Sequence, residues 1–411
     1  MRIVRTWEFS IVASYMVTLI AAGFFFGFER GLISDFGEMV RVPGVLITDY
    51  FVVGSIGAAL VNAGLVGLAG LAVAALSGVP IRGYIVAAVF TMAGFSFMGK
   101  TIINIWPIFL GVWIYARTQG DDFGQYILNA LFGTALAPLV SSVALQLDLG
   151  IAGALFLGAC AGFLVPPLAG HLLATHQGLN LYNIGFTCGF IGTLFAALFR
   201  GFGQSMDLAS IWGSGLNSQL ALPAMVYSAS MVLLGVTLTR GNLEGFFRIW
   251  RMPGALVSDF VSEGGLGGTL LNMGLVGLLG TGYVLLVRGD LNGPTLCGIF
   301  TMIGFGAFGK HPRNSVPIMA GAYLSLFLFR WQPAEAGPLL GVLFGTTLAP
   351  ISGTFGGLWG LGAGFLHMAM VMNVGFLHGG MNLYNNGFAG GIVATLMVGV
   401  LKQFNHEVRL G

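Results

Sequence analysis

The sequence predicts an all-α integral membrane protein built from two tandem homologous repeats. Of its 411 residues, 56% are hydrophobic and only 8% are charged, whereas about 25% of a soluble domain is charged. Apolar runs of about 20 residues, the length that crosses a bilayer as a helix, recur along the whole chain. Residues 41–108 also match residues 251–318 without a gap. A chain with so little polar surface cannot cover itself in water.

The apolar segments of the first half are each long enough to span a membrane. They are Phe9 to Phe28, Gly54 to Leu76, Tyr126 to Leu147, Leu149 to Leu173 and Ile184 to Phe199. With two shorter or broken segments, each repeat is expected to have about five to seven membrane segments. The first run is expected to be a retained helix, because it lacks the A-x-A cleavage site of a signal peptide.

The internal repeat gives the domain organisation. RVPGVLITDY (41–50) matches RMPGALVSDF (251–260), and HQGLNLYNIGF (176–186) matches HGGMNLYNNGF (378–388). The predicted domains are repeat 1 at 8–200, a linker at 201–221, repeat 2 at 222–401 and a polar C-terminal tail at 402–411. Many transporters are duplicated in this way and bind solute near mid-membrane where the repeats meet. In the alternative interpretation, duplication only builds a larger scaffold.

Charged residues give the expected orientation. The segment after the first helix has Arg30 and Arg41 among three acidic residues, whereas its counterpart has three arginines and one acidic residue. This difference favours opposite sides of the membrane for the two repeats, and therefore an inverted pair. Basic residues outside the first and last apolar runs predict that both termini are cytoplasmic. They are Arg2, Arg5, Lys402 and Arg409.

The segments GKTIINIWP (99–107) and GKHPRNSVP (309–317) interrupt apolar runs with glycine and proline. Irregular backbone at membrane depth is tolerated where it is buried in protein or lines a cavity, so we expect a broken or re-entrant element here. Free N–H groups at a half-helix terminus and nearby cations favour a small polar or anionic solute. The predicted solute-binding residues are Lys100, Asn104, Lys310, Arg313 and Asn314. Alternatively, these are connecting loops whose basic side chains extend to the membrane surface.

Asp49 and Asp259 occupy matching positions in TDY and SDF. Carboxylates in membrane segments commonly bind an ion, here H+ or Na+, or balance a basic residue such as Lys100 or Lys310. An aspartate that begins a helix can also be an ordinary N-cap. Both roles remain open at the level of sequence.

The duplicated HxGxNLYNxGF element opens the last apolar segment of each repeat. Asn180, Asn183, Asn382 and Asn385 are predicted to line the solute path, because amides offer donors and acceptors without charge. His176 and His378 are candidates for pH sensitivity. The alternative is that these amides satisfy broken backbone.

Several function classes are excluded by composition and motif. A net charge of +2 without a basic block argues against nucleic acid. Three isolated cysteines argue against a metal site, and no hydrolase, nucleotide or dinucleotide motif is present. We therefore predict no cofactor and no enzyme. The prediction is a transporter or channel for a small polar solute, an anion included, with its site between the repeats. The alternative is a non-transporting membrane subunit or scaffold.

AFGKHPRNSVP (307–317) and GMNLYNNGFAGG (380–391) resemble motifs of an uncharacterised bacterial multi-pass family with a duplicated domain of unknown function. That resemblance implies the bacterial cytoplasmic (inner) membrane. The plan of two glycine-rich repeats, each with a broken segment and a late YN stretch, is similar to the urea transporters. Their proline-asparagine-threonine motif is absent and each repeat here has a lysine, so no residue roles are transferred. This second resemblance implies inverted repeats around a central pore and a homo-oligomer with one path per protomer.

Overall fold

The computed structural model describes residues 7–27, 31–147, 149–204 and 210–404. Within these residues the chain forms α-helices and short 3-10 helices and no β-strand. One isolated β-bridge joins Thr48 to Ile211. The predicted all-α fold is therefore confirmed. Arg2, Arg5, Arg30 and Arg409, on which part of the orientation prediction rests, lie outside the described residues.

The described residues of repeat 1 form ten α-helices, and five helical stretches among them coincide with the predicted apolar segments. The helices are α1 (Trp7–Gly27), α2 (Leu32–Val40), α3 (Tyr50–Val53), α4 (Ile56–Leu76), α5 (Gly83–Phe95), α6 (Trp106–Gln119), α7 (Ile127–Gly133), α8 (Ala137–Leu145), α9 (Gly150–His176) and α10 (Asn183–Gly201). A 3-10 helix, η1 (Phe123–Tyr126), leads into α7, and another, η2 (Thr134–Leu136), joins α7 to α8.

Repeat 2 follows the same order. Its helices are α11 (Asn217–Thr239), α12 (Glu244–Arg251), α13 (Phe260–Leu286), α14 (Gly293–Phe305), α15 (Pro312–Ser325), α16 (Ala336–Gly345), η3 (Thr346–Leu348), α17 (Ala349–Phe355), α18 (Gly357–Val374) and α19 (Asn385–Phe404). α13 corresponds to α3 and α4 together and is kinked at Gly265, where φ is 69°. Among the described residues, nine helical stretches are long and apolar enough to cross a membrane.

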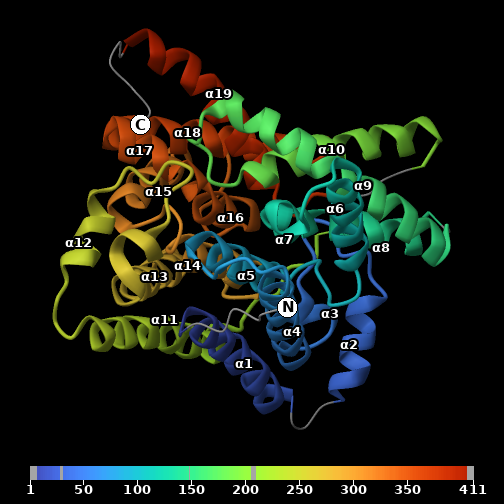
Figure 1. Ribbon diagram of the computed structural model, residues 1–411, viewed down its shortest axis with the longest axis horizontal. Helices are drawn as coiled ribbons and strands as arrows, with labels where there is room; N and C mark the ends of the chain where they lie inside the picture. Colours follow the sequence, from blue (N-terminus) through green and yellow to red (C-terminus); the bar gives the residue numbers. More distant parts are fainter. Residues whose placement is uncertain (1–6, 28–30, 148, 205–209, 405–411) are drawn as a thin grey trace.

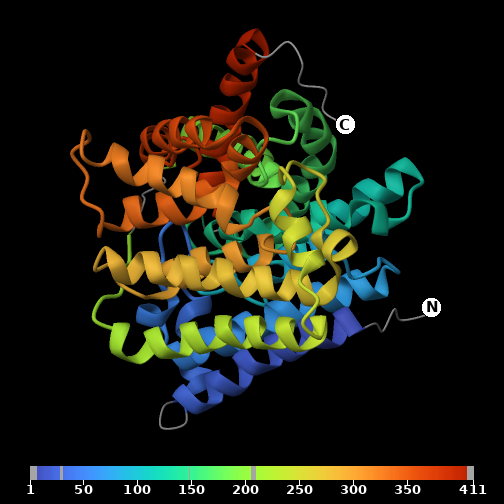
Figure 2. The same cartoon turned by 90° about the vertical axis from the view of Figure 1, so that its left-hand side faces the viewer.

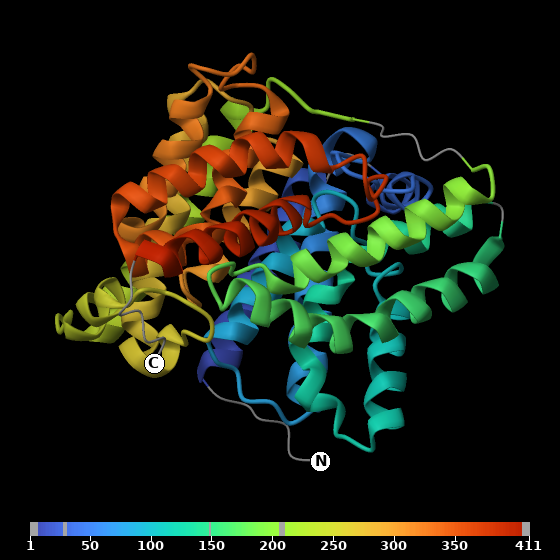
Figure 3. The same ribbon diagram turned by 90° about the horizontal axis from the view of Figure 1, so that it is seen from above.

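The two repeats lie side by side around a shared centre. In Figure 1 the green and cyan helices α6, α8 and α9 are on the right and the orange and yellow helices α13, α15 and α17 are on the left, while α14 lies next to α5 nearer the middle. Figure 2 shows the yellow-green α11 packed along the gold α13, as α1 packs along α4 in repeat 1. Seen from above in Figure 3, the red pair α18 and α19 lies beside the green pair α9 and α10.

The contact between α5 and α14 is reciprocal. A Cβ atom at Gly94 would lie 2.9 Å from Cβ of Phe300, and one at Gly304 would lie 2.8 Å from Cβ of Phe90. The helices are antiparallel, because the start of each approaches the segment just beyond the end of the other. Reciprocal contacts between equivalent residues are what a two-fold operation produces. The pair α5 and α14 therefore has an approximate two-fold axis perpendicular to both helices.

A second reciprocal contact joins α10 to α19. A Cβ atom at Gly185 would lie 2.8 Å from Cβ of Tyr384, and one at Gly387 would lie 2.9 Å from Cβ of Tyr182. These glycines allow the two helices to approach closely, as small residues commonly do between membrane helices. The pair α10 and α19 therefore also meets through equivalent residues of the two repeats.

The predicted helix breaks are present at both lysine segments. Residues 96–105 separate α5 from α6, and residues 306–311 separate α14 from α15. In each repeat a buried asparagine of the preceding long helix bonds the free carbonyls. The Asn62 amide donates to Ser96 O at 2.9 Å and Lys100 O at 2.8 Å, and the Asn272 amide donates to Gly306 O and Lys310 O. Buried irregular backbone is thus satisfied within the protein.

Candidate functional site

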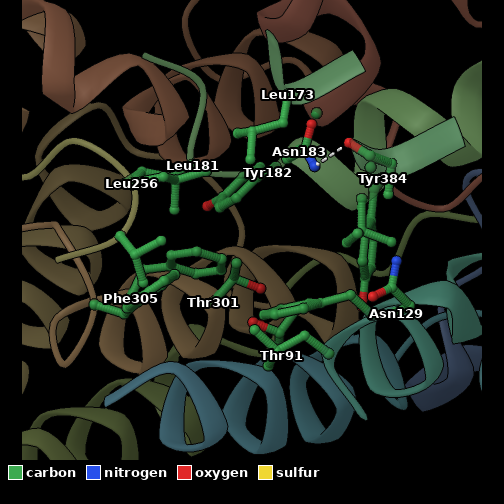
Figure 4. Close-up of a pocket in the computed structure, with 18 of the residues that line it drawn as sticks. Thr91, Asn129, Leu173, Leu181, Tyr182, Asn183, Leu256, Thr301, Phe305 and Tyr384 are labelled. Atoms are coloured by element: carbon green, nitrogen blue, oxygen red, sulfur yellow. Dashed lines mark hydrogen bonds between the residues drawn. The ribbon is translucent and has the colours of Figure 1, made fainter. Parts of the chain in front are cut away.

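A cavity of about 320 Å³ lies between the two repeats. Its lining comes mainly from α5, α7, α9 and α14 and from the segments that begin α10 and α19. Figure 4 shows Tyr182 and Asn183 on one side of the space, Thr91, Thr301 and Phe305 on the other, and Tyr384 and Asn129 beside it. The helices α10 and α19 therefore begin at this cavity.

Several pairs of equivalent residues line the cavity from both repeats. Among them are Thr91 and Thr301, Phe95 and Phe305, and Tyr182 and Tyr384. The threonines lie on α5 and α14, and each hydroxyl donates to the carbonyl four residues earlier, at 2.7 Å and 2.8 Å. A hydroxyl oxygen in such a bond still has free acceptor capacity. Both repeats therefore contribute equivalent side chains to the cavity.

The aromatic side chains form two equivalent walls. The ring centres of Phe95 and Tyr384 are 4.4 Å apart, and those of Phe305 and Tyr182 are 4.7 Å apart. Both pairs are tilted, an arrangement that adds stabilisation beyond burial. Each wall combines a ring from one repeat with a ring from the other. The shape of the cavity consequently depends on how the repeats meet.

Each predicted lysine bonds a tyrosine of the opposite repeat. Lys100 Nζ donates to the Tyr384 hydroxyl at 2.6 Å. Lys310 Nζ donates to the Tyr182 hydroxyl and, at 2.7 Å, to Thr346 Oγ1. Both lysines are fully buried, and neither is among the residues that line the cavity. The lysines therefore bond the tyrosines of the aromatic walls from the side that faces away from the cavity.

Neither lysine is in an ion pair with any residue that the structure describes. Lys100 Nζ lies 4.6 Å from the centre of the Tyr384 ring, and Lys310 Nζ lies 4.5 Å from that of Tyr182. A cation over an aromatic face is attracted by the ring, most strongly when it is desolvated. The ring faces and hydroxyls therefore take the place of a carboxylate.

The amides next to the lysines bond the broken backbone. The Asn104 side chain accepts from Thr101 N and donates to Gly99 O at 3.0 Å. In repeat 2 the Asn314 side chain likewise accepts from the backbone N–H of His311, the equivalent of Thr101, and donates to Gly309 O at 2.9 Å. Neither lines the cavity. Arg313 is exposed in the first turn of α15.

The later amides have two different positions. Asn180 Nδ2 donates to Gly387 O and Asn382 Nδ2 donates to Gly185 O, so this pair joins the repeats. Asn183 Oδ1 lies 2.9 Å from His176 Nε2, and Asn385 Oδ1 lies 3.0 Å from His378 Nε2. Of these four amides, Asn183 lines the cavity. Both histidines are fully buried.

Both aspartates are helix N-caps that also bond the opposite repeat. Asp49 accepts from Phe51 N at the start of α3 and from Gly293 N at the start of α14. Asp259 accepts from Val261 N in α13 and from Gly83 N in α5. In the described part of the chain neither aspartate pairs with a lysine. The structure thus places them at helix ends, away from Lys100 and Lys310.

The site residues predicted from the sequence did not include Thr91, Thr301, Phe95 or Phe305, whereas Tyr182 and Tyr384 belong to the NLYN element that was expected to face the solute. The signal was present, since FTMAGF (90–95) matches FTMIGF (300–305) and NLYN occurs in both repeats. The paired lining residues are uncharged, and the charged residues support them.

Comparison with protein families gives two separate matches along the chain. Residues 28–201 and 238–403 match the family described as a protein of unknown function, DUF1576. The chain belongs to the DUF1576 family. Each matched segment of this DUF1576 protein contains one lysine and one tyrosine of the crossed pairs. The predicted uncharacterised family with a duplicated domain is therefore confirmed. No curated protein and no solved structure matches the chain.

Proposed function

We propose that this protein is a membrane transporter or channel whose solute passes through the cavity between the repeats. The observation that carries the proposal is the cavity itself, about 320 Å³ in volume and lined by equivalent residues of both repeats. Concave sites with an apolar lining and a few convergent polar groups are typical of small-molecule binding. A non-transporting scaffold would instead favour a continuously packed interface.

The lining supports an uncharged polar solute more than an anion. Its polar groups are hydroxyls and amides, such as Thr91, Thr301, Asn129 and Asn386, and no charged side chain is among the described residues that line it. Lys100 and Lys310 donate into the protein rather than into the cavity. An anion would need a fixed donor or cation at the site.

The proposal includes inverted repeats. If α5 and α14 cross the membrane, the two-fold axis that relates these antiparallel helices lies in the membrane plane, as in many transporters. It also includes the urea-transporter-like plan, a homo-oligomer with one path per protomer, and location in a bacterial cytoplasmic membrane with both termini inside. Active transport by such a protein would be coupled to H+ or Na+.

The experiment is a solute screen on purified protein in lipid vesicles. Shrinkage and re-swelling by stopped-flow light scattering would be measured for small amides, polyols and inorganic anions. We expect an uncharged polar solute to cross protein-containing vesicles faster than empty ones. Equal rates for every solute would reject the proposal and favour the scaffold.

A conservative pair of substitutions locates the path. Thr91→Val and Thr301→Val together should slow the transported solute by roughly fivefold or more, since one lost hydrogen bond is worth about 1 kcal/mol. Thr281→Val is the matched control, because Thr281 is buried, bonds the carbonyl four residues earlier at 3.0 Å and does not line the cavity. The control should transport normally.

A further inference from the structure

The cavity between the repeats opens to the outside of the protein within repeat 1, where exposed residues are part of its lining. Gln125 in η1, just before α7, and Gly170 on α9 are exposed and line it, together with the half-buried Asn129 and the buried Pro166. A Cβ atom added to Gly170 would meet no atom within 4 Å. The gap between α7 and α9 is thus a mouth of the cavity.

Repeat 2 has an equivalent place between α16 and α18. FGT (132–134) matches FGT (344–346), and His176 matches His378. Counting from these anchors, the residues of the mouth correspond to other residue types in repeat 2. Gln125, Asn129, Pro166 and Gly170 correspond to Gly337, Gly341, Met368 and Met372.

The correspondence also holds in space. Gly162 on α9 packs against the Ile108 carbonyl of α6, and its equivalent Gly364 on α18 packs against the Ile318 carbonyl of α15. Asn183 donates to Ala169 O, and its equivalent Asn385 donates to Val371 O. The long helix is therefore seated in the same way in both repeats.

Two methionines fill the equivalent place in repeat 2. A Cβ atom at Gly337 would lie 2.6 Å from Met372 Sδ, and one at Gly341 would lie 2.9 Å from Met368 Cε. Met368 is fully buried and Met372 is half-buried. None of these four residues lines the cavity. Where repeat 1 has an opening, repeat 2 has thioethers packed on glycines.

We infer that repeat 2 contains a second mouth of the solute path, closed in this structure by Met368 and Met372. This inference rests on the proposed function, and the second mouth takes the same uncharged polar solute. Methionine suits such a closure, because its unbranched side chain has three rotatable bonds and changes rotamer readily. Glycine at the facing positions leaves room for the solute once the thioethers move.

The first test is solute flux through methionine variants in vesicles. Met368→Ala with Met372→Ala should raise the flux several-fold. Met370→Ala is the matched control, because Met370 is a half-buried methionine of the same helix that packs against the hydrophobic core. A double variant that elutes as folded protein and transports no faster than the wild type would overturn the inference.

The second test does not require transport. In a Cys160→Ser background, Asn129→Cys and Gly341→Cys place thiols at equivalent positions, while Cys188 and Cys297 stay buried. A polar maleimide should label Asn129→Cys rapidly and Gly341→Cys slowly in detergent. Adding the two methionine substitutions should accelerate labelling of Gly341→Cys.

The outcomes separate this inference from the proposed function. Equal labelling rates at the two thiols with both methionines present would show an open second mouth and refute the closure. Wild-type vesicles without flux for any solute would refute the proposed function, whereas normal flux with unchanged methionine variants would refute only the closure.

Discussion

At the scale of single residues, the crossed lysine–tyrosine pairs are the least expected feature of this protein. A buried ammonium normally needs a counter-charge or a full set of acceptors, because its desolvation is costly. Lys310 has two hydroxyl acceptors, Tyr182 and Thr346. For Lys100, the side-chain bond in the described structure is to Tyr384 alone. The two pairs are therefore equivalent in position and unequal in bonding.

This inequality predicts different costs for removing each phenol hydroxyl. Tyr384→Phe should destabilise the protein by about 2 kcal/mol, the value of a hydrogen bond to a charged group. Tyr182→Phe should cost about half as much, because Lys310 retains Thr346. Thermal unfolding of the two variants in one detergent measures the difference.

A double variant tests whether the stability lost in Tyr384→Phe comes from leaving the Lys100 ammonium without its hydrogen-bond acceptor. Lys100→Met combined with Tyr384→Phe should recover most of the stability lost in Tyr384→Phe, since replacing both partners by apolar groups leaves nothing unpaired. If the two losses simply add, the lysine and the tyrosine do not act as a pair.

At the scale of elements, the aspartate caps connect a helix of their own repeat to a helix of the other. Asp259 Oδ1 accepts from Val261 N at 3.1 Å and from Gly83 N at 2.9 Å, and Oδ2 accepts from Ser262 Oγ. An N-cap needs an acceptor oxygen and does not need a charge. Ion coupling, in contrast, needs the carboxylate.

Asp259→Asn therefore separates the two roles. The amide oxygen can keep both backbone bonds, and the amide N–H can donate to Ser262, so we expect normal folding and normal solute flux. Asp259→Ala should lower stability by about 1 kcal/mol or more through loss of the cap. If Asp259→Asn folds normally but loses pH- or sodium-dependent uptake, the aspartate is an ion-coupling residue.

At the scale of the whole molecule, the close approach of α5 and α14 positions both walls of the cavity. Gly94→Ala places a methyl group 2.9 Å from Phe300 Cβ and 3.0 Å from the Cys297 carbonyl. Overpacking of this kind typically costs about 1–3 kcal/mol. We expect a lower unfolding temperature and slower solute flux, because the walls are displaced.

Gly282→Ala is the matched control for that substitution. Gly282 is exposed on α13, and a Cβ atom there would meet nothing within 4 Å. Replacing a helical glycine by alanine at an open position should raise stability by about 0.5–1 kcal/mol. Equal effects of the two substitutions would show that the α5–α14 contact is not tightly packed.

The sequence by itself determined the class of the protein, the duplication and the positions of the broken segments. Membrane helices satisfy their own backbone, so an apolar run of sufficient length predicts a helix without knowledge of its neighbours. Glycine and proline at 99–107 and 309–317 likewise act locally. The five long segments of repeat 1 and both breaks could therefore be predicted from residues alone.

Only the tertiary structure decided which residues line the cavity. Lys100 and Tyr384 are 284 residues apart. No local sequence pattern can therefore predict that the lysine bonds the tyrosine instead of a solute. The same holds for Asp49, whose partner Gly293 belongs to the other repeat. Duplication shows that the same residue occurs at equivalent positions of both repeats. The direction in which its side chain points depends on how the two repeats pack against each other. For this reason the sequence could predict that the two lysines are important, but not that they bond the tyrosines that line the cavity.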